Sequence, residues 1–183
     1  MHDNIEKGVK ILLVDDDRSM LTALSEMVRE VGHTPLCADN WSAALGKYRE
    51  EKPDLVLLDV MMPTIDGFKL ARIIKTDGGP FVPIILLTAL EDIESKRRAM
   101  AAGADDFLSK PVNPLELRIR LSSMLRIKDL ARQLEAANLM LTELAVTDAL
   151  TGVPNRRALY SHLQREFARA KRPRRLPEVM TRD

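Results

Sequence analysis

The 183-residue sequence contains a single cysteine, Cys37, and few aromatic residues, which make up 4% of the chain. One thiol excludes an internal disulfide and favours a reducing compartment such as the cytoplasm. No apolar run approaches the roughly 20 residues of a membrane-spanning helix, and the charged start MHDNIEKGVK lacks the apolar segment of a signal peptide. The sequence therefore predicts a cytoplasmic protein that does not engage a membrane, with a core of aliphatic residues.

The chain also has little net charge, +1 at neutral pH, which gives no overall case for binding nucleic acid. The balance is uneven, because residues 156–183 hold nine Lys and Arg against three acidic residues, a net +6 that leaves −5 for the remainder. No helix-turn-helix segment or set of stacking aromatics accompanies these basic residues. We therefore expect a solvated basic tail, with nucleic-acid binding unlikely.

Short apolar runs alternate with stretches of helical periodicity along the first two thirds of the chain. The apolar runs span residues 10–14, 34–38, 54–58, 83–87 and 105–109. The amphipathic stretches between them span 19–31, 40–50, 67–76 and 91–102. Continuous apolar strands are typical of a parallel sheet that helices cover on both faces. The pattern predicts a doubly wound α/β domain with five parallel strands.

From Pro114 to about Val146 the sequence contains no further proline and no glycine, which predicts one long C-terminal helix. Apolar residues repeat at heptad spacing in its second half, at Ile127, Leu134 and Leu141 and at Leu130, Ala137 and Leu144. This narrow stripe favours a coiled-coil-like stalk over residues 127–146 that pairs with a second copy. A helix that packs on its own domain is the alternative.

Charged and polar side chains stand at the ends of four predicted strands. Asp15, Asp16 and Asp17 follow the first strand, Asp59 ends the third, Thr88 ends the fourth and Lys110 follows the fifth. The carboxyl ends of parallel strands meet at one edge of the sheet, where ligands bind in such folds. Clustered carboxylates need a cation, and an all-oxygen ligand set favours Mg²⁺. The hydroxyl and ammonium groups would contact an anion on that metal, so the arrangement predicts a phosphoryl site.

The motifs LLVDDD, LLDVMMPTIDG, ILLTA and FLSKP stand in this order between residues 12 and 111. With them, residues 8–126 resemble the receiver domain of two-component response regulators. The resemblance implies a flavodoxin-like sheet with strand order 2-1-3-4-5 and a phospho-acceptor role for Asp59. It also implies that Asp15, Asp16 and Asp59, with the backbone carbonyl of Met61, bind Mg²⁺.

The same resemblance assigns further roles in signalling. Thr88 and Phe107 would form the switch, Lys110 would pair with the phosphoryl group, and the Lys110–Pro111 bond would be cis. Asp17 is expected to be a solvated helix cap. The implied protein is a phosphorylated switch rather than a turnover enzyme. Its implied partners are a sensor histidine kinase or phosphotransfer protein and a second copy, bound through the last domain helix and the stalk.

Two other resemblances bear on function. VDDDRS is similar to the signature of haloacid dehalogenase-like phosphatases, in which Asp15 would be the nucleophile and Asp17 the acid/base. Ser19 and the DVMMPTIDG turn fit that family poorly. TDALTGVPNRRAL, residues 147–159, resembles the opening motif of GGDEF diguanylate cyclase domains, in which Asn155 would contact guanine.

The cyclase resemblance does not extend through the C-terminal region. No GG(D/E)EF signature follows, and too few residues remain after Asp148 for a cyclase domain. We expect residues 147–183 to be a remnant of that domain with a basic tail. The alternative is that the chain is the N-terminal regulatory fragment of a diguanylate cyclase.

Overall fold

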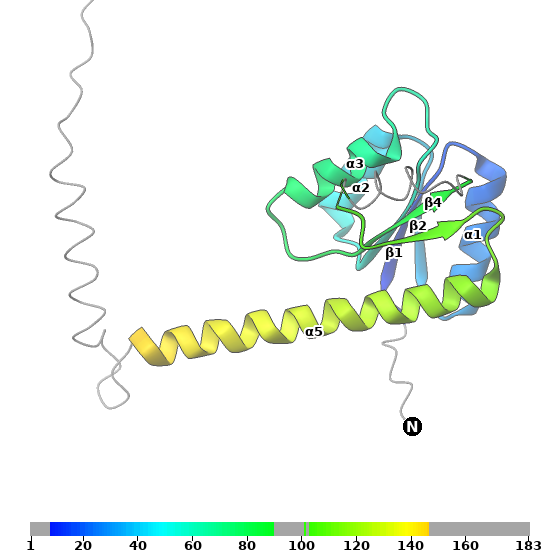
Figure 1. Ribbon diagram of the computed structural model, residues 1–183. Helices are drawn as coiled ribbons and strands as arrows, with labels where there is room; N and C mark the ends of the chain where they lie inside the picture. The colour runs from blue at the N-terminus through cyan, green and yellow to red at the C-terminus, as the bar shows by residue number, and fades with distance from the viewer. Residues whose placement is uncertain (1–7, 90–100, 102, 147–183) are drawn as a thin grey trace, which may run out of the picture. The chain divides into compact units, whose positions relative to one another are not determined.

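Five parallel strands form one sheet in the order β2-β1-β3-β4-β5, which confirms the predicted α/β fold (Figure 1). The computed structural model describes residues 8–89, 101 and 103–146. The strands are β1 (Lys10–Val14), β2 (Thr34–Ala38), β3 (Leu55–Asp59), β4 (Ile84–Thr88) and β5 (Asp106–Ser109). The helices are α1 (Arg18–Glu30), α2 (Trp41–Glu51), α3 (Gly67–Thr76) and α5 (Pro114–Val146). The helix predicted over 91–102 lies outside the described residues.

The strand side chains alternate between two apolar layers, one on each face of the sheet. Leu12 and Val14 of β1 point to the layer under α2 and α3, whereas Ile11 and Leu13 point to the layer under α1 and α5. All four side chains are fully buried. Burial on both faces explains why the strands read as continuous apolar runs instead of alternating ones.

Each described helix begins at a side chain that accepts hydrogen bonds from the first turn. Asp17, Asn40 and Asp66 cap α1, α2 and α3 by accepting from the amides of Ser19, Ala43 and Lys69. Asn113 does the same for α5, with distances of 2.9 and 3.2 Å to two amides of its first turn. Such caps are typically worth about 1 kcal/mol each. They start the helices at the carboxyl edge of the sheet, where the predicted site lies.

The β2 edge of the sheet is protected against pairing with another strand. Thr34 donates its amide to Val9 at 2.9 Å and Ala38 accepts from Asp15 at 3.2 Å, so the backbone groups of Pro35 and Cys37 turn to the open side. Pro35 has no amide hydrogen to offer. The Lys47 ammonium donates to the Cys37 carbonyl at 2.5 Å. Both devices make strand addition at this edge unfavourable.

The helix α5 changes its surroundings along its length. Leu117, Leu121 and Met124 are buried against the sheet. Contacts divide the chain into two units between Arg132 and Gln133, and in the second unit the side chains of residues 133–141 are exposed. The side chain of Leu144 lies outside the described residues. Among the described helices none combines the length and apolar character that spanning a membrane requires.

His33 is a buried titratable residue at the end of the sheet opposite the predicted site. Its side chain is 5% exposed. Among the buried side-chain nitrogen and oxygen atoms of the described residues, its Nδ1 alone lacks a hydrogen-bond partner. Burial lowers the pKa of His33 below its ordinary value, and the Asp54 carboxylate offsets only part of this effect. Neutral His33 is therefore favoured in the folded protein.

This burial predicts a loss of stability in mild acid. The unfolded chain binds a proton at His33 as the pH falls through 6.5, before the folded chain does. The free energy of unfolding should therefore decrease below that pH, until the lowered folded-state pKa is passed. Urea unfolding at about pH 7.5 and 5.5 should show a larger loss for the parent than for His33→Gln. Equal losses in the two proteins would show that His33 does not contribute.

Candidate functional site

The predicted site residues stand at the carboxyl edge of the sheet, on the ends of different strands. Asp15 follows β1, Asp59 is the last residue of β3, and Lys110 follows β5. The structure brings these three together, because the Lys110 ammonium lies 2.8 Å from Asp15 Oδ2 and 2.8 Å from Asp59 Oδ1. One cation thus bridges two carboxylates that are 44 residues apart in sequence.

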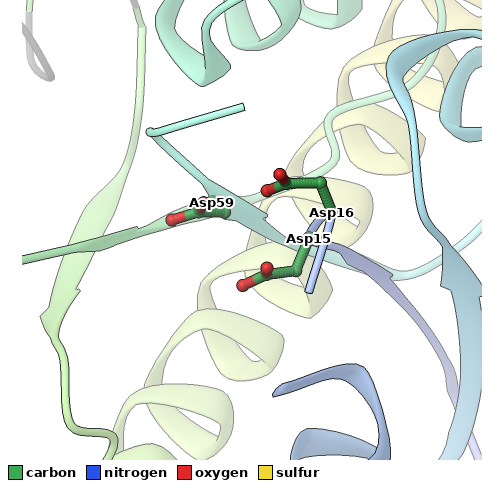
Figure 2. A group of neighbouring side chains, drawn as sticks. All are labelled: Asp15, Asp16 and Asp59. Carbon is green, nitrogen blue, oxygen red and sulfur yellow. The ribbon is translucent and has the colours of Figure 1, made fainter. Parts of the chain in front are cut away.

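Asp15, Asp16 and Asp59 form a cluster that could hold a metal ion. Each offers a carboxylate oxygen, and these oxygens lie within 4.8 Å of one another. Figure 2 shows the three carboxylates directed to the same side of the sheet edge. The side chains of Asp15 and Asp59 are buried, whereas Asp16 is exposed to solvent. An all-oxygen set with one side open to water fits Mg²⁺, which keeps several waters when bound.

The start of α1 holds Asp15 in place. The amide of Asp17 donates to Asp15 Oδ1 at 2.9 Å, which leaves Oδ2 for Lys110. The Asp17 side chain is exposed and accepts from the Ser19 amide at 2.8 Å. This geometry confirms Asp17 as a helix cap rather than a member of the cluster.

Electrostatics within the cluster depend on burial and on Lys110. Burial raises the pKa of Asp59 above its ordinary value, and the Lys110 ammonium and the Met61 amide offset only part of this rise. Burial alone would lower the pKa of Lys110, but the hydrogen bonds from Lys110 to Asp15 and Asp59 outweigh it and raise that pKa. Lys110 therefore remains a cation at neutral pH, next to a carboxylate with little access to water.

Thr88 and Phe107 occupy neighbouring strands beside this cluster. Thr88 is buried at the end of β4, and its carbonyl accepts from the Lys110 amide at 2.8 Å. Phe107 is half-buried in β5, where it pairs in register with Leu86. The Lys110–Pro111 bond is cis, as predicted. The switch roles of Thr88 and Phe107 and the metal contact of the Met61 carbonyl remain predictions.

Gly67 positions Asp59, and sequence reasoning did not identify it as a site residue. A Cβ at Gly67 would lie 2.1 Å from the backbone oxygen of Asp59, closer than any real contact. The Gly67 amide also donates to the Val60 carbonyl at 3.0 Å. The first residue of α3 thus packs directly on the backbone of the acidic residue. The glycine at the end of LLDVMMPTIDG was the signal that could have indicated this.

Comparison with known proteins agrees with this geometry. Residues 11–122 match the family model of the response regulator receiver domain. The chain belongs to this family. The family match covers nearly all of the described sheet and the first part of α5. It therefore confirms the predicted receiver domain over nearly its whole length and not only at the strand-end motifs.

The curated relatives of this receiver domain are more than one third identical to it. The probable transcriptional regulator ycf27 of Guillardia theta is 37% identical over 67% of this chain and 48% of its own length. The alkaline phosphatase synthesis transcriptional regulatory protein PhoP of Bacillus subtilis is 37% identical over 67% of this chain and 50% of its own length. The chain thus spans about half the length of these curated relatives.

Among solved structures, the BeF3-activated receiver domain of DrrB, a Thermotoga maritima protein, is similar to this chain. It is 37% identical, has a TM-score of 0.59 and covers 65% of this chain and 98% of its own length. The match supports the receiver fold over about two thirds of the chain.

Three further predictions concern the dehalogenase-like alternative, the GGDEF-like segment and nucleic-acid binding. The receiver match and the capping role of Asp17 do not favour the haloacid dehalogenase-like alternative. Residues 147–183, with Asn155, lie outside the described residues and outside the family match. Two of the relatives are named transcriptional regulators, so the expectation that nucleic acid is not a partner is unconfirmed.

The close contact at Gly67 and the open space at Gly46 predict opposite effects on stability when each glycine is replaced by alanine. Gly67→Ala should lower the free energy of unfolding by about 1–3 kcal/mol, because the new methyl group displaces the Asp59 backbone. Gly46→Ala lies inside α2 with nothing within 4 Å of the new atom, and it should raise stability by about 0.5–1 kcal/mol. Urea unfolding of both variants checks this. If Gly67→Ala is as stable as the parent, the close packing is absent.

Proposed function

We propose that this receiver domain accepts a phosphoryl group on Asp59 in a two-component phosphorelay. The observation that carries the proposal is the convergence of Asp15, Asp59 and Lys110, with both carboxylates 2.8 Å from the same ammonium. Asp16 adds the third carboxylate. Opposed charges of this kind at one sheet edge suit the binding of a divalent cation and an anion together.

In the proposed reaction, one carboxylate oxygen of Asp59 attacks the phosphorus of the donor. A new O–P bond forms, the bond from phosphorus to the leaving group breaks, and the electron pair leaves with that group. Asp59 becomes an acyl phosphate. Bound Mg²⁺, held by Asp15, Asp16, Asp59 and the Met61 carbonyl, would neutralise charge on the phosphoryl oxygens. Lys110 is placed to pair with one of these oxygens.

The proposed switch connects this site to the surface through Thr88 and Phe107. The hydrogen bond between the Lys110 amide and the Thr88 carbonyl joins the ends of β4 and β5. Added charge at Asp59 would draw the Thr88 hydroxyl towards the phosphoryl group and leave room for Phe107 to turn inwards. Such a local electrostatic change is sufficient to bias a two-state element.

The proposed domain organisation follows from the sequence. Residues 8–126 form the receiver domain, residues 127–146 the stalk, and residues 147–183 a segment with a GGDEF-like opening motif and a basic tail. The proposed phosphoryl donor is a sensor histidine kinase or a phosphotransfer protein. The proposed homodimer uses α5, whose side chains Ile127, Leu130, Leu134 and Leu141 are all more than two fifths exposed.

Phosphorylation of Asp59 is open to direct test with acetyl phosphate. Intact-mass spectrometry should show one phosphoryl adduct in the presence of Mg²⁺ or Mn²⁺ and none after chelation. Asp59→Asn should abolish the adduct, because the nucleophilic oxygen is lost. Asp39→Asn is the matched control, since Asp39 follows β2 at the same edge but pairs with Arg18.

Two outcomes would contradict this assignment. An equal yield in Asp59→Asn would move the acceptor to another residue. Loss of the adduct in Asp15→Asn, with retention in Asp59→Asn, would restore the haloacid dehalogenase-like alternative.

Dimerisation through the stalk predicts a position-specific effect of charge. Leu134→Lys places an ammonium at the centre of the predicted seam and should weaken self-association. Ala136→Lys adds the same charge at an exposed position away from the seam and should leave association unchanged. Light scattering over a concentration series measures both, with and without beryllofluoride, which should strengthen the parent dimer. Equal association of all three proteins would exclude the stalk as the interface.

A further inference from the structure

A groove beside the β2 edge is separate from the acidic cluster. Its volume is about 480 Å³, within the range of about 300–1,000 Å³ common for small-molecule sites. Ser25 and Arg29 of α1 line one wall, Lys47 of α2 lines the other, and Cys37 and Asp39 line the floor at the end of β2. All of these elements are within the described residues.

The wall formed by α1 makes the groove long rather than round. Arg18, Ser25 and Arg29 are separated by seven and four residues, a spacing that places them on one helix face. The eleven residues from Arg18 to Arg29 correspond to about 16 Å of helix. Leu21 lies between Arg18 and Ser25 along α1, and Ala43 of α2 also lines the groove. The groove therefore combines charged ends with a partly apolar middle.

Positive charge dominates this groove. It contains three cationic side chains, Arg18, Arg29 and Lys47, against one carboxylate, Asp39. Asp39 pairs with Arg18 at 3.4 Å, and the two side chains are 42% and 87% exposed, so this pair is weak. Within the described part of the chain, neither Arg29 nor Lys47 makes an ion pair, and the Lys47 ammonium donates to the Cys37 carbonyl. Arg29 thus has no carboxylate partner among the described residues, whereas Lys47, after Lys10, helps to lower the pKa of Glu51 one helical turn further along α2.

The backbone of β2 limits what the groove can accept. An added peptide strand would need the outward groups of Pro35 and Cys37, but Pro35 has no amide hydrogen and Lys47 occupies the Cys37 carbonyl. We propose that the groove binds a linear small-molecule dianion with an apolar middle, whose two acidic groups meet Arg18 at one end and Arg29 at the other, with Lys47 of α2 as a third cation beside it. This site is independent of phosphoryl transfer at Asp59 and goes beyond it.

Cys37 provides a reporter inside the groove. It is the single cysteine of the chain, it is partly exposed, and its Sγ lies 3.0 Å from the Ser25 hydroxyl. A molecule in the groove would cover this thiol. Its rate of alkylation by the uncharged reagent iodoacetamide therefore measures occupancy, and intact-mass spectrometry reads a single modification.

The test uses azelate, a linear nine-carbon dicarboxylate, with 1,9-nonanediol as the uncharged match and NaCl to hold ionic strength constant. Azelate should slow alkylation of the full chain several-fold and saturably, with a half-effect at about 1 mM or below. The diol should have no effect. The double variant Arg29→Gln, Lys47→Gln should lose the protection. Lys69→Gln, an exposed change on α3, should keep it.

Three results would overturn the proposal. They are no slowing by azelate up to about 10 mM, equal slowing by the diol, and equal protection in the double variant. Arg29→Gln alone changes an exposed side chain and should reduce the protection, so the test also holds if the double variant fails to fold. Acetyl phosphate labelling of Asp59 in the same variants should be unchanged, which separates this site from the proposed function.

Discussion

The bridge from Lys110 to both Asp15 and Asp59 is the interaction on which the rest of this structure depends. It joins the ends of β1, β3 and β5 with two contacts of 2.8 Å. Removing the cation would leave two buried carboxylates close to each other, a costly arrangement in a site with little water. The pKa of Asp59 is raised by burial even with the lysine present. The site therefore favours further positive charge, which the proposed divalent cation would supply.

The surrounding fold keeps this bridge in register. Two fully apolar layers fix β1 and β3 side by side, so that Val14 pairs with Leu58 and the following acidic residues emerge together. The Asp17 amide orients Asp15, and Gly67 lets α3 begin directly on the Asp59 backbone. These supports are local, and they hold the carboxylates in the fixed positions that the proposed phosphoryl transfer requires. A shift in any of them moves a carboxylate away from Lys110.

Much of this arrangement could be predicted from the sequence because strand ends in a parallel sheet meet at one edge. That rule predicts the positions of Asp59, Thr88 and Lys110. Among the described elements, the predicted strand and helix boundaries differ from the structure by one residue at most. Gly67 was missed, since a close approach between two backbones leaves no periodic signal. The burial of His33 Nδ1 and the groove lined by Cys37 were also missed, because both depend on side chains from several elements. Such contacts appear only when the elements are packed together.

The most direct test of the account is to locate the phosphoryl group chemically. Borohydride reduces an acyl phosphate at an aspartate to homoserine, with release of phosphate, so the acceptor is marked in its peptide. After treatment with acetyl phosphate and Mg²⁺, tandem mass spectrometry of the reduced protein should find homoserine at position 59 and aspartate at positions 15 and 16. Homoserine at position 15 or 16, with aspartate retained at position 59, would contradict the account.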